Sequence, residues 1–269
     1  MYCRDGSLHF SAVKEIDKSA AHFAWAVQHG KFDTRGMRIG RVWHALTLQE
    51  IEPYVFDGDR RGAKWAEFVK ERSLQSVDLV DDYYQRDNVS DVLTPPEWDV
   101  VRWMRDRTMA DHHARELLAR CTNRETSHEW VYKGHPWRGK IDAHGDGAIL
   151  ELKSTKCAAK WAYLRDAGRM HYDAQLVSYD IALGAVLCGL DTEWQEHDQI
   201  AVENSAPFAV QVYQTSNVRK DQALARLDRW MMVFDACHRA GDFGGYYQQG
   251  ITEWDADIIT HDEEEEDDA

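Results

Sequence analysis

The stretch RGKIDAHGDGAILELK, residues 138–153, contains two apolar runs separated by the sequence HGDG at 144–147. Glycine and aspartate favour the backbone angles that a tight hairpin turn requires. The pattern therefore predicts two antiparallel strands joined by a short turn. The other elements of the chain are placed around this predicted hairpin.

The second strand of the hairpin alternates apolar and charged residues. Side chains at positions i and i+2 of a strand point to one face, so Glu151 and Lys153 should project together. Leu150 and Leu152 should then turn into the core. Strand pairing would also bring Asp142 beside the two charged side chains.

Two carboxylates and one ammonium would therefore converge in a largely apolar setting. Burial of such charges is costly unless they bind a cation or each other. Asp142 and Glu151 offer the oxygen ligands that suit Mg²⁺, and Lys153 could hold an attacking water or neutralise a phosphoryl oxygen. The alternative is a surface ladder of salt bridges, which would contribute little to stability.

The composition describes a folded globular protein. The 269 residues are 43% hydrophobic and include 11 Trp, enough to bury a full core, and we expect one domain over residues 1–260. No apolar run approaches the ~18–20 residues of a membrane span. The first residues, MYCRDGSLHF, also lack the apolar segment of a signal peptide. The expected compartment is therefore the cytoplasm.

The net charge of −15 argues against a generic nucleic-acid binder, for which a basic balance is expected. Part of this charge belongs to the tail HDEEEEDDA at 261–269, which we expect to be disordered. A nucleic-acid enzyme can still be acidic overall if its basic groups line one groove and metal ions offset its carboxylates. The charge therefore limits the class of binder without excluding such an enzyme.

The five cysteines are scattered along the chain and form no C-x-x-C pair. A zinc or iron–sulfur site therefore has no support from spacing. We expect reduced thiols, some of them buried as small apolar side chains.

Apolar spacing and turn residues predict a helical region over about 1–122, followed by a part that contains the strands, over about 123–247. Helices are expected over 7–30, 37–48, 62–72, 95–121, 156–166, 171–188 and 218–240. Strands are expected over 125–133, 136–144, 147–153, 199–202 and 207–213. Residues 73–94 are polar and weakly periodic, and they stay unassigned.

Two further residues could reach the predicted hairpin site. His44 lies on the predicted helix 37–48, where Gly40 allows close packing, although a single histidine on an apolar helix is more often part of the core. Glu129 lies on the predicted strand 125–133 and could point to the same site, but an exposed acid explains it equally well. On the helix that follows the hairpin, Gln175 and Tyr179 are an i, i+4 pair on one stripe.

Several separated segments together resemble one known family. They are SAVKEIDKSAAHF at 11–23, MRIGRVWHALTL at 37–48, FDGDRRGAKWAEF at 56–68, GKIDAHGDGAILELKST at 139–155, HYDAQLVSYDIAL at 171–183 and GDFGGY at 241–246. The chain resembles the RecE-like (exonuclease VIII type) exonucleases, in the RecB-like branch of the PD-(D/E)xK nuclease superfamily. The segments occur in the family's order over most of residues 7–247.

The resemblance implies an α/β (α+β) fold: a PD-(D/E)xK core with a central mixed β-sheet flanked by helices and an added N-terminal helical region. The chain departs from the superfamily name, because Ile141 stands where the proline precedes the first acid. It also lacks the four-cysteine iron–sulfur site of some RecB-like relatives.

The resemblance also assigns roles to individual residues. The implied metal ligands are His44, Asp142, Glu151 and the backbone carbonyl of Leu152. The implied catalytic residues are Lys153, Asp142, Glu151 and, by a weaker match, Glu129. Gln175 and Tyr179 match the helix motif that contacts DNA or orients the lysine. Arg38 and Arg41, which flank Gly40, are candidates for gripping a DNA-end phosphate, and surface arginines are the alternative.

The implied activity is a 5′→3′ exonuclease that digests linear double-stranded DNA with Mg²⁺ or Mn²⁺, two ions per site, and leaves a 3′ single strand for strand annealing. The relatives also imply a ring-shaped homo-oligomer (trimer or tetramer), a single-strand annealing protein as partner, and the cytoplasm of a bacterial host cell. Two alternatives remain. One is a structure-specific or flap endonuclease on the same core, and the other is a catalytically idle module that binds DNA ends or protein.

Overall fold

A five-stranded mixed sheet in the order β1-β2-β3-β4-β5 is the centre of the structure. The computed structural model describes residues 3, 6–29, 33–74, 88–184 and 193–245. The strands are β1 (Asn123–Tyr132), β2 (His135–Gly145), β3 (Ala148–Thr155), β4 (Glu196–Glu203) and β5 (Val210–Gln214). Neighbouring strands are antiparallel except β3 and β4, which are parallel. The mixed sheet expected from the resemblance is therefore confirmed.

The predicted hairpin joins β2 to β3. Asp146 and Gly147 form its two-residue loop, and both have positive φ, 47° and 71°. Positive φ at both positions is the requirement of a type I′ turn, which aspartate tolerates and glycine meets without strain. The ladder between the two strands covers 143–145 and 148–150 only, and it stops one residue before Asp142.

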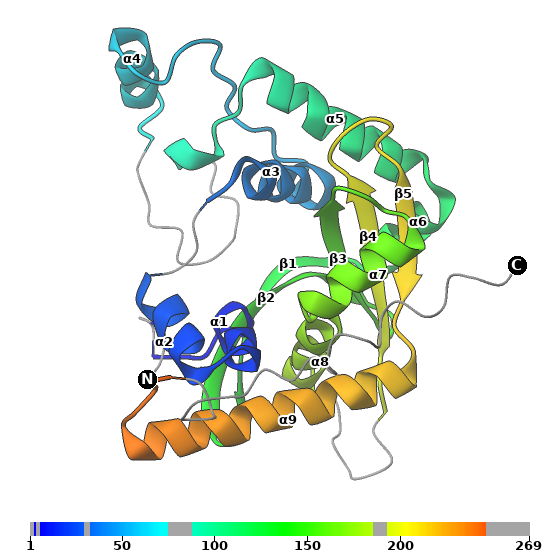
Figure 1. Cartoon of the computed structure of the whole chain (residues 1–269). Helices are drawn as coiled ribbons and strands as arrows, with labels where there is room; N and C mark the ends of the chain where they lie inside the picture. The colour runs from blue at the N-terminus through cyan, green and yellow to red at the C-terminus, as the bar shows by residue number, and fades with distance from the viewer. Residues whose placement is uncertain (1–2, 4–5, 30–32, 75–87, 185–192, 246–269) are drawn as a thin grey trace, which may run out of the picture.

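Helices flank this sheet (Figure 1). They are α1 (Phe10–Val13), α2 (Ala20–His29), α3 (Arg35–Gln49), α4 (Ala63–Glu71), α5 (Pro95–Ala110), α6 (His112–Arg120), α7 (Lys160–Arg169), α8 (Tyr172–Ala182) and α9 (Asn217–Ala240). Short 3₁₀ helices occupy Lys14–Asp17 and Val89–Asp91. The crossover between the parallel strands β3 and β4 contains α7 and α8, as parallel pairing requires.

Two large apolar clusters hold the helices to the sheet. The first joins α3, α5 and α6 to β3 and β4, and it includes Leu150 and Leu152, both fully buried as the alternation predicts. The second joins α1, α2, α8 and α9 to the end of the β1–β2 hairpin around Trp137. In Figure 1 these two groups of helices lie toward opposite ends of the sheet. The site described below lies where α3 and α8 both approach β3.

The single long helix expected over 95–121 is wrong. The structure has two helices there, α5 and α6, and Asp111 between them is extended, with φ −71° and ψ 129°. The Asp111 carboxylate accepts the N–H of Ala114 at 2.9 Å and caps α6. Aspartate competes for backbone donors in this way and so favours a helix start over a helix interior.

Three sequence expectations fall partly or wholly outside the described residues. They concern the end of the predicted helix 171–188, most of the unassigned segment 73–94, and the acidic tail 261–269. Within the described part, every helix is too short or too polar to cross a membrane. Among the described cysteines, Cys121, Cys157 and Cys237 are free thiols.

Candidate active site

The charged residues of the hairpin converge where β2 and β3 stop pairing. The Asp142 carboxylate accepts the backbone N–H of Leu152 at 2.8 Å, so the side chain takes a donor that the ladder has released. On β3, Lys153 Nζ donates to Glu151 Oε1 at 2.8 Å. Asp142 and Glu151 are buried, with 7% and 4% of their surface exposed. These residues therefore do not form an exposed surface ladder.

His44 reaches the same place from α3. A Cβ added to Gly40 would lie 2.9 Å from Ser154 Oγ, so the absent side chain lets α3 pack directly on β3. One turn further along the helix, His44 Nδ1 lies 3.4 Å from Asp142 Oδ2. The close helix–strand contact therefore explains how a residue distant in sequence comes to face the hairpin.

Glu125 completes a compact group that the sequence reasoning did not identify. One ligand atom each from His44, Glu125 and Asp142 lies within 4.8 Å of the others. Glu125 stands opposite Asp142, between the pairs Arg124↔Ala143 and Thr126↔Ile141. Its φ of +55° interrupts the regular strand at this point.

Glu129, by contrast, is exposed and stands opposite Arg138, further along β1 toward the β1–β2 turn. The structure therefore does not bring Glu129 to the site, and Glu125 supplies the acid from β1. The β1–β2 turn at 133–134 could have located Glu125, because counting back from that turn puts residue 125 opposite residue 142.

The polar stripe of α8 reaches the site, where Gln175 forms hydrogen bonds to both site residues of β3 and to Tyr179. Gln175 Oε1 accepts from Lys153 Nζ at 3.0 Å, and its amide donates to Glu151 Oε1 at 3.0 Å and to Tyr179 Oη at 2.9 Å. Lys153 Nζ also lies 4.2 Å from the centre of the Tyr172 ring, a cation–π contact. The stripe therefore fixes the positions of Lys153 and Glu151.

Burial and mutual charge shift the pKa of each acid in the group. Burial and then the charge of Asp142 raise the pKa of Glu151 to about 7. The same two causes raise the pKa of Glu125. For Asp142 burial acts in the opposite direction, but the attraction of His44, Lys153 and the Leu152 N–H outweighs it and lowers the pKa. Ionisation of all three neighbouring acids is therefore unfavourable unless a further positive charge binds beside them.

The two bases respond to the same acids. Burial opposes their charged forms, but Asp142 raises the pKa of His44 and Glu151 raises the pKa of Lys153. Both shifts show that the site carries an excess of negative potential.

The donor set fits a divalent cation. Glu151 Oε2 is buried and has no hydrogen-bond partner among the described residues, which is unusual for a carboxylate oxygen. Carboxylates suit Mg²⁺, and a histidine nitrogen beside them is accepted more readily by Mn²⁺. Leu152, whose carbonyl the resemblance adds to the ligands, is fully buried between Glu151 and Lys153, and its role as a ligand stays a prediction.

Residues 9–243 match the family described as "PDDEXK-like domain of unknown function" (DUF3799). The chain belongs to this family. The PDDEXK-like core expected from the resemblance is therefore confirmed.

A solved structure agrees with the fold of this PDDEXK-like domain. A protein from Eubacterium rectale, described as a "putative exonuclease", is similar over 92% of this chain and 91% of its own, with a TM-score of 0.56 and 12% sequence identity. A second structure, SSO0001, covers 83% of this chain and 85% of its own at 11% identity, but its TM-score of 0.29 carries no argument. No curated protein matches the sequence.

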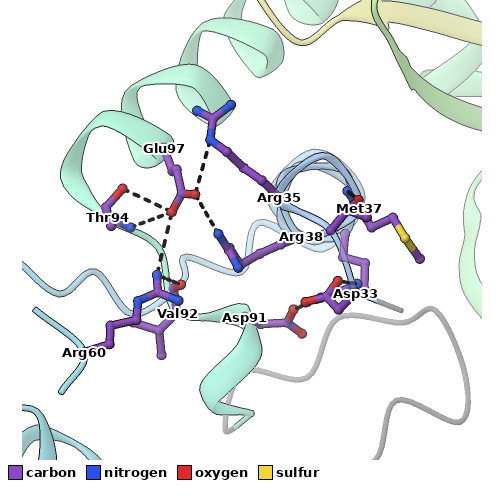
Figure 2. A network of polar contacts seen from close by, with 11 residues as sticks. Asp33, Arg35, Met37, Arg38, Arg60, Asp91, Val92, Thr94 and Glu97 are labelled. Carbon is purple, nitrogen blue, oxygen red and sulfur yellow. Dashed lines mark hydrogen bonds and ion pairs between the residues drawn. The ribbon is translucent and has the colours of Figure 1, made fainter. Parts of the chain in front are cut away.

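Arg38 of the PDDEXK-like domain forms an ion pair within the protein. It donates to Glu97 on α5 at 2.7 Å, and the same carboxylate also faces Arg35 and Arg60 at 3.4 and 3.7 Å (Figure 2). Glu97 in turn accepts from Thr94, which starts α5 with a capping box. This arrangement fastens the first turn of α3 to the first turn of α5.

Arg41 is buried and is also held by acids. It donates to Asp91 at 2.9 and 2.6 Å and to Asp33 at 2.9 Å. These contacts give both arginines a structural partner, and phosphate binding by either of them stays a prediction.

Two adjoining cavities open onto this candidate site, with volumes of about 500 and 470 Å³. His44, Lys153 and Tyr172 line both cavities, so the cavities meet at the site. The second also contains Asp142, Glu151, Gln175 and Tyr179 in its wall. A substrate can therefore approach Lys153 from two directions.

Proposed function

We propose that the protein is a metal-dependent 5′→3′ exodeoxyribonuclease that digests linear double-stranded DNA and leaves 3′ single strands for strand annealing. The observation that carries the proposal is the group of His44, Glu125 and Asp142 beside Glu151 and Lys153, at the β2–β3 hairpin of a PDDEXK-like core. Metal ligands next to a held lysine, at the meeting point of two open cavities, suit phosphodiester hydrolysis.

The residues of the site divide the chemistry between them. His44, Glu125, Asp142 and Glu151 would hold Mg²⁺ or Mn²⁺, and two ions per site are proposed from the resemblance. When bound, such ions activate water and stabilise negative charge at the scissile phosphate. Lys153 faces the cavities and neutralises charge that develops on a phosphoryl oxygen.

Gln175 has a positioning role in this mechanism. It accepts a hydrogen bond from Lys153 and donates one to Glu151, so it keeps the ammonium at a fixed distance from the ligands. Positioning of this kind reduces the reorganisation needed in the transition state.

The proposed action at DNA ends and the proposed oligomer rest on similarity to known proteins rather than on the geometry of the site. The RecE-like resemblance and the description of the Eubacterium rectale protein as an exonuclease favour action at DNA ends over internal cutting. A ring-shaped homo-oligomer, trimer or tetramer, would enclose the duplex and so allow many cuts per binding event. A single-strand annealing protein is the proposed partner that takes up the 3′ strand.

The test compares linear duplex DNA with intact circular duplex DNA in Mg²⁺ and in Mn²⁺. We expect digestion of the linear DNA only, with loss of a 5′ label before a 3′ label. Lys153→Ala should abolish digestion, whereas the matched control Lys64→Ala, on the exposed side of α4, should digest as the wild type does. Equal cutting of the circle would establish an endonuclease, and no metal-dependent cutting of either DNA would overturn the proposal.

A further inference from the structure

The outer face of α7 has an unusual combination of side chains. Trp161 is 71% exposed and Leu164 is 46% exposed, although such large apolar side chains are usually covered. Lys156, Lys160, Arg165 and Arg169 are exposed around them. The surface formed by Lys156, Lys160, Trp161, Arg165 and Arg169 is called the α7 surface below.

The charge of the α7 surface is opposite to that of the whole molecule. Residues 156–169 contain four basic residues and one acid, Asp166, in a chain whose net charge is −15. Asp166 lies 3.8 Å from Arg165 and 3.6 Å from Arg169, so one carboxylate faces two guanidinium groups. The surface therefore keeps an excess of positive charge.

Three residues of the α7 surface lie in one line along the helix. Trp161, Arg165 and Arg169 follow i, i+4 and i+8, which places them on one stripe of the helix. The guanidinium of Arg165 lies 5.6 Å from the centre of the Trp161 ring. At 1.5 Å per residue the stripe is about 12 Å long, the length of about four nucleotides of one strand at 3.4 Å each.

One end of this stripe lies at the catalytic site. Arg169 and Lys156 line the cavity of about 500 Å³ that His44 and Lys153 also line. Figure 1 shows α7 in front of β3 and β4. A strand that leaves the site along α7 would therefore meet Arg169 first, then Arg165, and then Trp161.

We infer that the α7 surface binds an unpaired strand of the DNA substrate, with a base stacked on Trp161 and phosphates on the basic side chains. The inference rests on the proposed nuclease function and adds the path of the strand outside the site. Exposed aromatic rings between basic residues are how proteins hold single strands without reading sequence. The occupant is DNA rather than a second copy of this chain, because Lys156 and Arg169 of this surface line the same cavity as His44 and Lys153, where the substrate must enter.

The test measures binding and hydrolysis separately. Binding to a labelled single strand and to a blunt duplex is measured in EDTA, where no cutting occurs. Hydrolysis of bis(p-nitrophenyl) phosphate in Mn²⁺ reports the catalytic group with a substrate too small to reach Trp161. Trp161→Ala and Arg165→Gln are compared with Trp103→Ala and Arg105→Gln on α5, because Trp103 is also exposed, at 54%.

Trp161→Ala should weaken binding of the single strand about tenfold, the loss of one stacked base, with a smaller effect on blunt duplex. Arg165→Gln should reduce the slope of log affinity against log salt by about 0.7. Both variants should hydrolyse the small ester as the wild type does, and the α5 controls should bind DNA as the wild type does.

Other outcomes separate this inference from the proposed function. Wild-type affinity in both α7 variants, in a protein that cuts DNA, overturns the inference alone. A change of oligomeric state in Trp161→Ala, with unchanged binding per assembly, assigns the surface to a contact between copies and also overturns it. A wild type that hydrolyses neither ester nor DNA overturns the nuclease proposal, and weaker strand binding by Trp161→Ala would still support the α7 surface.

Discussion

At the scale of single residues, the site combines side chains that local pattern can identify with others that only the fold brings in. Asp142, Glu151 and Lys153 lie around one turn, so the period of a strand and one hairpin are enough to bring them together. Glu125 depends on the register of a second hairpin, which must be counted to the residue. Arg41 donates hydrogen bonds to Asp33 and Asp91, and no sequence spacing indicates these contacts.

The choice between Glu125 and Glu129 can be tested directly. Glu125→Gln should lower metal-dependent cutting by more than about 100-fold, since loss even of groups that only support a ligand costs about 10–100-fold. Glu129→Gln is the matched control, because it makes the same chemical change on an exposed part of the same strand, and it should cut as the wild type does. The measurement is the initial rate of cutting of labelled duplex DNA. A larger loss in Glu129→Gln than in Glu125→Gln would show that Glu129 is the acid of β1 that acts in the site.

At the scale of elements, the site depends on how closely α3 and α5 are held to the sheet and to each other. Gly40 sets the distance between α3 and β3, while Glu97 joins α3 to α5 through arginines. Neither contact supplies a catalytic group. Both determine where His44 stands relative to Asp142.

The contact at Gly40 predicts a coupling between two substitutions. Gly40→Ala should gain about 1 kcal/mol from helix propensity, but its Cβ would lie 2.9 Å from Ser154 Oγ, and crowding of this kind costs about 1–3 kcal/mol. In a Ser154→Ala background the nearest atom is the Cβ at 3.7 Å, so the same change should stabilise the protein. Urea unfolding of the four proteins measures this coupling, and purely additive effects would show that α3 is free to shift.

The Glu97 contacts predict a pH-dependent stability. Burial opposes ionisation of Glu97, but the Thr94 N–H and the Arg38 guanidinium outweigh it and hold the pKa of this carboxyl below its ordinary value. The stabilisation is therefore present above the ordinary pKa of about 4.3 and is lost as the pH falls through the lower, folded-state pKa.

Glu97→Gln should destabilise the protein by about 2–3 kcal/mol at neutral pH. This is less than the loss for a fully buried pair, because 27% of the Arg60 side chain is exposed. The difference between wild type and Glu97→Gln in urea should shrink when the pH is lowered toward 3. A difference that stays constant with pH would show that the carboxylate charge is not what holds the two helices together.

At the scale of the whole molecule, the order of helices and strands was predictable from the sequence, because amphipathic period and turn residues are local. The split of the helix expected over 95–121 was not, since Asp111 interrupts an otherwise continuous apolar period only by capping. Gly40 indicated close packing of α3, but the sequence did not show that its partner is β3. The partners of Arg38 and Arg41 could not be predicted, because they depend on which helix ends come together.

The whole-molecule consequence of the site is a stability that depends on metal. The fold buries three carboxylates near one another, and burial raises the pKa of Glu151 to about 7 and also that of Glu125. A divalent cation that relieves this repulsion binds the folded protein only, and at about 100 times its dissociation constant it contributes about 2.7 kcal/mol. For a chain of this size, Mn²⁺ should then raise the melting temperature by about 5–10 °C. Asp142→Asn removes a ligand and should lose this rise, whereas Glu129→Gln should keep it, as calorimetry with and without Mn²⁺ can measure. An equal rise in Asp142→Asn would place the bound metal elsewhere in the molecule, and no rise in the wild type would mean that the acids are already satisfied by His44 and Lys153.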